Sequence, residues 1–276
     1  TGSELVGLVP LDAMLSAGKY YLKKQGRSIG VPEQDIIECA VQSLGLNDVT
    51  KFKPKDKIID YAVSSNTNSL VDLNFLHELS RNSPAPGGGS VSALAGALGS
   101  SLSSMVASLS HEKKGMFDKR PEMDQIGEEA QVLLKRLTFL IDEDTSAFNN
   151  VMSANRLTTE NNEDKKNKEL EIENANKYAA EVPLETAKLC LKVAILAEKL
   201  IKIGNPSSIT DAAVAVEVSV AGLRGACLNV LININEISDG SFSSKKSKEV
   251  KDLIEKSEEL RVVSFNNTLK IISGFK

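Results

Sequence analysis

The chain has 276 residues, of which 41% are hydrophobic and 25% charged, with a formal net charge of −4. This length allows one or two domains, and the hydrophobic share is enough for a buried core. The slightly acidic balance offers no basic face, so we expect neither nucleic acid nor a membrane as a partner. The cysteines are odd in number and far apart, which argues against disulfides or a zinc site and favours a reducing, cytoplasmic location: Cys39, Cys190 and Cys227.

The first 63 residues predict a small mixed α/β segment. A short apolar run over 4–10 ends in Pro10, and helical patterns follow over 11–25 and 32–44. We expect a linker at 64–69, because this stretch is polar, uncharged and unsuited to a core.

The remainder, 70–276, predicts a separate domain that is all helical. Aromatic residues make up only 4% of the chain and tryptophan is absent, which favours packed helices over sheet. The short joints between the long helical tracts predict antiparallel neighbours, so the fold class is mainly α, a bundle of long antiparallel helices. The expected helices span 71–81, 90–111, 121–156, 161–203, 208–237 and 247–272.

One helical tract, 91–109, is long and nearly uncharged, so a membrane span has to be considered. Serines interrupt it repeatedly and small residues form one of its faces, which suits close packing between helices. We therefore predict that it is the central helix of the bundle. The charged or polar stretches 161–168 and 241–248 are expected to be exposed turns or solvated helix ends.

A glycine run precedes this central helix and ends in Gly88, Gly89 and Ser90. Unpaired backbone N–H groups and the positive end of the helix dipole make such a junction a candidate site for polar ligand groups. The alternative is a flexible turn in which Ser90 is the N-cap of the helix.

Asp144 lies in the middle of a long helical tract. At helical spacing it falls on the apolar stripe, whereas Asp142 and Glu143 point elsewhere. An inward carboxylate is costly to ionise, which raises its pKa and suits it to proton transfer near neutrality. A structural aspartate that bonds a neighbouring helix or subunit is an equally good interpretation of the pattern. The stripe consists of Leu133, Leu137, Ile141, Asp144, Phe148 and Val151.

Polar residues also open and line the apolar tract over 208–237. Asn205 and Asp211 lie at its start, where helix capping is a sufficient explanation of Asp211. Further along, Asn229 and Asn233 share one face of the helix. Their amide groups need partners and are suited either to bonds between helices or to the edge of a heterocycle such as a pterin.

Taken in order, these segments resemble the cyclodeaminase domain of the formimidoyltransferase-cyclodeaminase family, which also includes stand-alone cyclodeaminases and bacterial methenyltetrahydrofolate cyclohydrolases. The preceding stretches 3–10 and 52–61 resemble the end of the formimidoyltransferase domain. The segments that carry the resemblance are 76–91 with its Pro-Gly-Gly-Gly-Ser, Asp142-x-Asp144-x-x-x-Phe148, Gly204-Asn205 with Asp211, and Asn229 with Asn233.

The resemblance implies conversion of 5-formimidoyltetrahydrofolate to 5,10-methenyltetrahydrofolate and ammonia in histidine degradation, with no metal and no cofactor beyond the folate substrate. It maps the catalytic aspartate onto the pair Asp142 and Asp144, and the stripe selects Asp144. Transferase activity is not expected, since that catalytic histidine would precede this chain. The implied folate-binding residues are Gly88, Gly89, Ser90, Asn205, Asp211 and Asn229.

Two alternatives stay open on the sequence. The first is a cyclohydrolase that acts on the methenyl product with water. The second is a non-catalytic helical module for oligomerisation. The small-residue faces of the helices favour a homo-oligomer, and the resemblance implies at least a dimer.

Overall fold

The computed structural model describes residues 4–63 and 73–274. The chain divides into two compact units, Thr1–Pro84 and Ala85–Lys276. The predicted linker at 64–69 and the predicted helix start at 71 lie outside the described residues, and the domain limits stay a prediction.

The first unit is built from short helices. Its core contains Met14, Ile37 and Ile58, and the predicted helices over 11–25 and 32–44 are present as α1 and α2. The β part of the expected α/β segment consists, among the described residues, of one parallel bridge between Val9 and Ile58. The helices of this unit are α1 (Leu11–Lys24), α2 (Glu33–Ser43), α3 (Pro54–Lys57), α4 (Ile59–Val63) and α5 (Leu73–Leu79).

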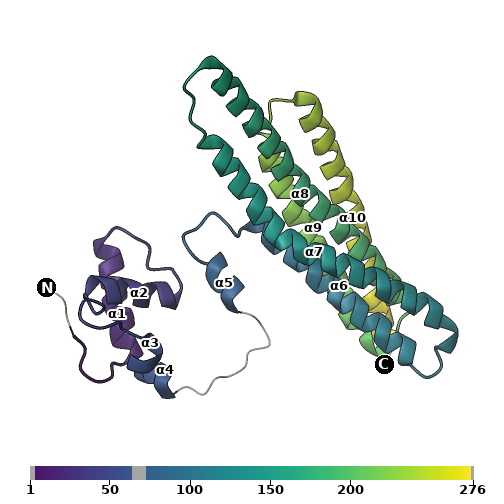
Figure 1. Ribbon diagram of the computed structural model, residues 1–276. Helices are drawn as coiled ribbons and strands as arrows, with labels where there is room; N and C mark the ends of the chain where they lie inside the picture. Colours follow the sequence, from purple (N-terminus) through teal and green to yellow (C-terminus); the bar gives the residue numbers. More distant parts are fainter. Residues whose placement is uncertain (1–3, 64–72, 275–276) are drawn as a thin grey trace. The chain divides into compact units, whose positions relative to one another are not determined.

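The second unit is a bundle of long helices that lie side by side along most of their length (Figure 1). Short connections, two of which contain the 3-10 turns η1 (Phe117–Lys119) and η2 (Pro206–Ser208), join antiparallel neighbours. The predicted mainly α fold is confirmed. The long helices are α6 (Gly88–Glu112), α7 (Arg120–Asn155), α8 (Asn162–Ile203), α9 (Ile209–Ile234) and α10 (Gly240–Gly274).

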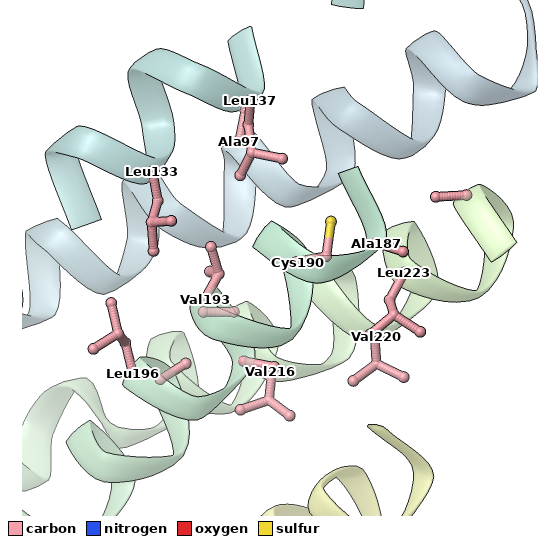
Figure 2. Close-up of a cluster of buried hydrophobic side chains, with 14 of the residues drawn as sticks. Ala97, Leu133, Leu137, Ala187, Cys190, Val193, Leu196, Val216, Val220 and Leu223 are labelled. Atoms are coloured by element: carbon pink, nitrogen blue, oxygen red, sulfur yellow. The ribbon is translucent and has the colours of Figure 1, made fainter. Parts of the chain in front are cut away.

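The core of the bundle is formed by α6, α7, α8 and α9, whose apolar side chains interdigitate in Figure 2. Two stretches, Gly88–Glu112 and Pro206–Ile234, are long and apolar enough to cross a membrane, and 56% and 50% of their most apolar windows is buried inside the bundle. Glycine lets these two helices approach closely, since a Cβ on Gly222 would lie 2.7 Å from the backbone oxygen of Ser92.

The last helix, α10, begins at Gly240, well before the predicted start at 247. The carboxylate of Asp239 accepts a hydrogen bond from the backbone N–H of Phe242 at 3.0 Å and so caps the first turn. Lys246 is 7% exposed and pairs with Glu181 at 2.5 Å. The stretch 241–248 is therefore helical, because a cap and an ion pair compensate its poor apolar content.

Candidate active site

The carboxylate of Asp144, on α7, lies at the first turn of α6. Gly87 occupies the N-cap position of α6 and supplies no side-chain hydrogen bond. Instead, Oδ2 of Asp144 accepts a hydrogen bond from Oγ of Ser90 at 3.1 Å, and the carboxylate also accepts the backbone N–H of Ser90. A side chain from a neighbouring helix thus satisfies a donor that a helix start leaves unpaired.

Ser90 is the third residue of α6, so the alternative prediction that it is the N-cap is wrong. The helix begins two residues earlier, because Gly88 and Gly89 adopt helical conformation rather than forming a turn. The Ser90 hydroxyl is fully buried and lies 2.9 Å from the backbone oxygen of Ile141. It therefore bridges α6 to the turn of α7 that carries Asp144.

Gly89 is buried directly beneath this carboxylate. A Cβ on Gly89 would lie 2.6 Å from Oδ2 of Asp144 and closer still to the other carboxylate atoms. Asp142, two residues earlier on α7, is exposed. The inward orientation that the apolar stripe predicted for Asp144 is therefore found in the structure.

Burial raises the pKa of Asp144, and the two hydrogen bonds from Ser90 oppose that rise without cancelling it. No charged neighbour contributes to the shift. A half-buried carboxyl group with a raised pKa is suited to accept a proton and to return it. Within 4–63 and 73–274, no group of three or more His, Cys, Asp and Glu side chains is arranged to hold a metal ion.

Asn229 reaches the same place from α9. Its Nδ2 donates to the backbone oxygen of Gly225 at 2.8 Å, and a Cβ on Gly88 would lie 3.3 Å from that nitrogen. The side chain thus lies against the first turn of α6, half-buried. Three helices therefore bring together five of the seven predicted site residues: Gly88, Gly89 and Ser90 from α6, Asp144 from α7 and Asn229 from α9.

Asn205 and Asp211 are not part of this cluster within one chain. The backbone N–H of Asn205 donates to Oγ of Ser110 at 2.7 Å, near the C-terminal end of α6, and Asp211 lies in the first turn of α9 at the same end. At 1.5 Å per residue, Ser110 and Ser90 are about 30 Å apart along α6. A single chain therefore does not bring these two residues to Asp144, because the antiparallel order places the start of α9 beside the end of α6, and their predicted folate-binding role stays a prediction.

The side chain of Asn205 has a local role instead. Its Oδ1 accepts the backbone N–H of Ser207 at 3.0 Å and caps η2. The separation of Asn205 and Asp211 from Ser90 could be predicted from the expected helix lengths. Long helices joined by short connections alternate in direction, so the start of α6 and the start of α9 lie at opposite ends of the bundle.

Comparison with known proteins places the fold in a family. Residues 73–252 match the family model described as formiminotransferase-cyclodeaminase, and residues 1–64 match the formiminotransferase domain. The formimidoyltransferase-cyclodeaminase of Rattus norvegicus is 32% identical over 259 residues, which cover 92% of this chain and 48% of that protein. The methenyltetrahydrofolate cyclohydrolase of Methylorubrum extorquens is 38% identical over 180 residues, which cover 65% of this chain and 86% of that protein.

A solved structure shows the same fold. The crystal structure of formiminotetrahydrofolate cyclodeaminase from Thermotoga maritima superimposes with a TM-score of 0.63 at 31% identity, covering 75% of this chain and 98% of that chain. The helical bundle is therefore of the cyclodeaminase type. The chain belongs to the formiminotransferase-cyclodeaminase family. It spans about half the length of the formimidoyltransferase-cyclodeaminases that it matches.

Proposed function

We propose that this chain is a formimidoyltetrahydrofolate cyclodeaminase, an ammonia-lyase that converts 5-formimidoyltetrahydrofolate to 5,10-methenyltetrahydrofolate and ammonia in histidine degradation. The observation that carries the proposal is the half-buried carboxylate of Asp144, held against the first turn of α6 by Ser90 and raised in pKa by burial. The names of the Rattus norvegicus and Thermotoga maritima relatives support it.

The formimino group reacts as its amidinium cation, whose exocyclic nitrogen already carries two protons, so the reaction requires one proton to move from N10 to that nitrogen. N10 of the folate attacks the formimino carbon and forms a C–N bond, and its proton passes to the carboxylate of Asp144. The carboxyl group then returns the proton to the exocyclic nitrogen, whose bond to carbon breaks as ammonia leaves. The methenyl carbon then bridges N5 and N10. A single carboxyl group with a raised pKa can perform both transfers in turn.

The groups around Asp144 supply folate contacts in this proposal. The exposed Gly88 lets a ligand approach the backbone at the positive end of α6, and the buried Gly89 and Ser90 contribute by holding the Asp144 carboxylate at that place. The half-buried amide of Asn229 offers a donor and an acceptor to the edge of the pterin. The proposed chemistry uses the folate substrate alone, with no metal or redox cofactor.

A second candidate is a methenyltetrahydrofolate cyclohydrolase. It is favoured by the Methylorubrum extorquens relative of that name, which is 38% identical to this chain. In that reaction, water attacks the methenyl carbon and the carboxylate of Asp144 accepts a proton of the water. The bond from this carbon to one of its two nitrogens then breaks, that nitrogen takes the proton from Asp144, and the remaining hydroxyl proton passes to solvent as the formyl group forms. The same site would serve, so only the substrate separates the two candidates.

We also propose that the chain acts in the cytoplasm as at least a dimer. Support comes from apolar side chains that α6 leaves exposed at heptad spacing, Val91 (38%), Leu98 (52%) and Met105 (40%). Asn205 and Asp211 belong to the proposed folate site only if a partner subunit supplies them. For the whole protein we propose glutamate formimidoyltransferase activity in addition, and for this chain cyclodeamination alone.

The test is a direct assay of the purified chain. Formimino-folate is supplied and the rise in methenyltetrahydrofolate absorbance is recorded, beside a second reaction in which methenyltetrahydrofolate is the substrate and its absorbance falls. We expect ammonia release in the first reaction. Turnover in the second alone assigns the cyclohydrolase. No turnover in either, together with no folate-dependent rise in the melting temperature, assigns a non-catalytic helical module.

A further inference from the structure

Helix α8 contains a proline in its interior, Pro183. Because proline has no backbone N–H, the carbonyl of Ala179, four residues earlier, loses its partner within α8. Asn233 of α9 supplies a replacement, since its Nδ2 donates to the Ala179 oxygen at 2.6 Å. Asn233 on α9 therefore supplies the hydrogen bond that Pro183 removes from the Ala179 carbonyl of α8.

Ala179, whose carbonyl Asn233 binds, belongs to an apolar cluster next to the candidate active site. The cluster consists of Ala93, Leu140, Ala147, Ala179 and Val182. Two of these residues lie about one turn before and one turn after Asp144 on α7, and Ala93 lies one turn after Ser90 on α6. The segment of α8 just before Pro183 thus packs, through this cluster, against the turns of α6 and α7 that flank Ser90 and Asp144.

Asn233 also lies one turn beyond Asn229 on α9. Its bond to Ala179 fixes α9 to α8 at the level of the apolar cluster. Asn229 touches the first turn of α6, and that turn holds the carboxylate of Asp144. The hydrogen bond from Asn233 to Ala179 therefore links α9, which carries Asn229, to the apolar cluster that packs beside Asp144.

We propose that Asn233 is a positioning residue: its hydrogen bond to Ala179, opposite Pro183, sets the relative placement of Asn229 and Asp144. The proposal rests on the proposed function for its effect on turnover. Its structural part, the seating of the first turn of α6, is measurable without turnover.

Asn176 provides a matched control. It lies on α8 and its Nδ2 donates to the backbone oxygen of Glu236, beyond the end of α9, at 3.0 Å. This bond also joins α8 to the α9 segment through an asparagine and a carbonyl. However, its acceptor Glu236 is not a member of the apolar cluster, whereas Ala179, the acceptor of Asn233, is a member, so loss of the Asn176 bond should affect stability alone.

The experiment uses the full chain and the variants Asn233→Leu, Pro183→Ala, the double variant of both, and Asn176→Leu. Leucine is similar in size to asparagine and removes the donor. Alanine at 183 restores the backbone N–H, so in the double variant the Ala179 carbonyl regains a partner within α8 while the bond between α8 and α9 stays absent. Melting temperature, kcat and KM, and hydrogen exchange over 88–93 are measured for each.

We expect Asn233→Leu to lower the melting temperature by about 2–6 °C, because a part-buried carbonyl loses its partner, and to lower kcat about tenfold through misplacement of the carboxylate. Hydrogen exchange over 88–93 should be faster in Asn233→Leu than in the wild type. In the double variant, the melting temperature should recover, while kcat stays low and hydrogen exchange over 88–93 stays faster than in the wild type. Pro183→Ala should resemble the wild type, and Asn176→Leu should lower the melting temperature with kcat unchanged.

Recovery of kcat together with the melting temperature in the double variant would overturn the proposal, because Asn233 would then only satisfy a carbonyl. An equal loss of kcat in Asn176→Leu would also overturn it. If the wild type has no turnover, the proposed function fails by itself, and hydrogen exchange over 88–93 then tests the positioning role of Asn233. Exchange that is fast in the double variant and slow in Asn176→Leu supports this role. Exchange that is unchanged in the double variant rejects it.

Discussion

The carboxylate of Asp144 occupies the space into which a side chain on Gly89 would project. A Cβ on Gly89 would lie 2.6 Å from Oδ2 of Asp144, closer than real Cβ contacts come. Only glycine at this position lets the carboxylate from α7 reach the backbone N–H of Ser90 in the first turn of α6. The glycine run therefore has a steric function in this protein, because it admits the side chain that satisfies the helix start.

Gly89→Ala should displace the Asp144 carboxylate from Ser90. We expect kcat to fall about 100-fold or more, as for a misplacement of about 1 Å, and the free energy of unfolding to fall by about 1–3 kcal/mol as the hydrogen bonds are lost. Steady-state kinetics and urea unfolding measure the two effects. Gly88→Ala is the control for the steric effect on stability: its Cβ would lie 3.3 Å from Nδ2 of Asn229, so a small side-chain shift suffices and the loss of unfolding free energy should be much smaller.

Asp144→Asn should abolish ammonia release and leave the fold intact. The asparagine oxygen can still accept a hydrogen bond from Ser90, so we expect the free energy of unfolding to change by about 1 kcal/mol or less. Asp142→Asn, at an exposed position two residues away, should retain full turnover. The absorbance assay for methenyltetrahydrofolate compares them, and loss of turnover in Asp142→Asn with retention in Asp144→Asn would reverse the assignment.

The raised pKa of Asp144 has a definite sign in the dependence of stability on pH. Between its ordinary value, about 3.9, and its raised native value, the native state binds more protons than the unfolded state. This group therefore stabilises the native state at low pH, and that contribution is lost as pH rises through the window. The melting temperature of Asp144→Asn minus that of the wild type should rise over the same window. A difference that falls with pH would mean that the native pKa is depressed.

Ser90→Ala should shift the pH profile of the reaction. The Ser90 hydroxyl stabilises the ionised carboxylate, so its loss should raise the pKa of Asp144 further. If the ionised form accepts the N10 proton, the acid limb of kcat/KM moves to higher pH. The limb should stay in place in Ser92→Ala, whose hydroxyl bonds the backbone oxygen of Gly88 instead. An unmoved limb in Ser90→Ala would show that Asp144 does not control it.

Asn205→Ala should lower stability with little effect on turnover. Its side chain caps η2 through Ser207, and loss of such a cap costs about 1 kcal/mol. The site at Ser90 is about 30 Å away along α6, so we expect kcat to stay within about twofold of the wild type, a change equivalent to about 0.4 kcal/mol in the barrier. Kinetics at a temperature below both melting points separates the effects. A large loss of kcat would show that a partner subunit brings this residue to the site.

The long helices could be predicted closely because their signal is local. Apolar residues recur at helical spacing along α7, and short polar joints interrupt the pattern near both of its ends. The same spacing predicted that Asp144 faces inward and Asp142 outward. Helix α10 begins earlier than the apolar pattern predicts, because the Asp239 cap starts it and the ion pair of Lys246 with Glu181, a contact between helices that no local pattern reveals, supports its first turns.

The sequence by itself determined the family, the helical class and the direction of the Asp144 side chain, since each depends on patterns within short segments of the chain and on the order of those segments. Only the tertiary structure decided which polar residues meet. It placed Asn229 beside Gly88 and moved Asn205 and Asp211 to the far end of the bundle, because antiparallel packing fixes which helix ends are neighbours. It also gave Asn233 a partner, the carbonyl that Pro183 leaves open on α8.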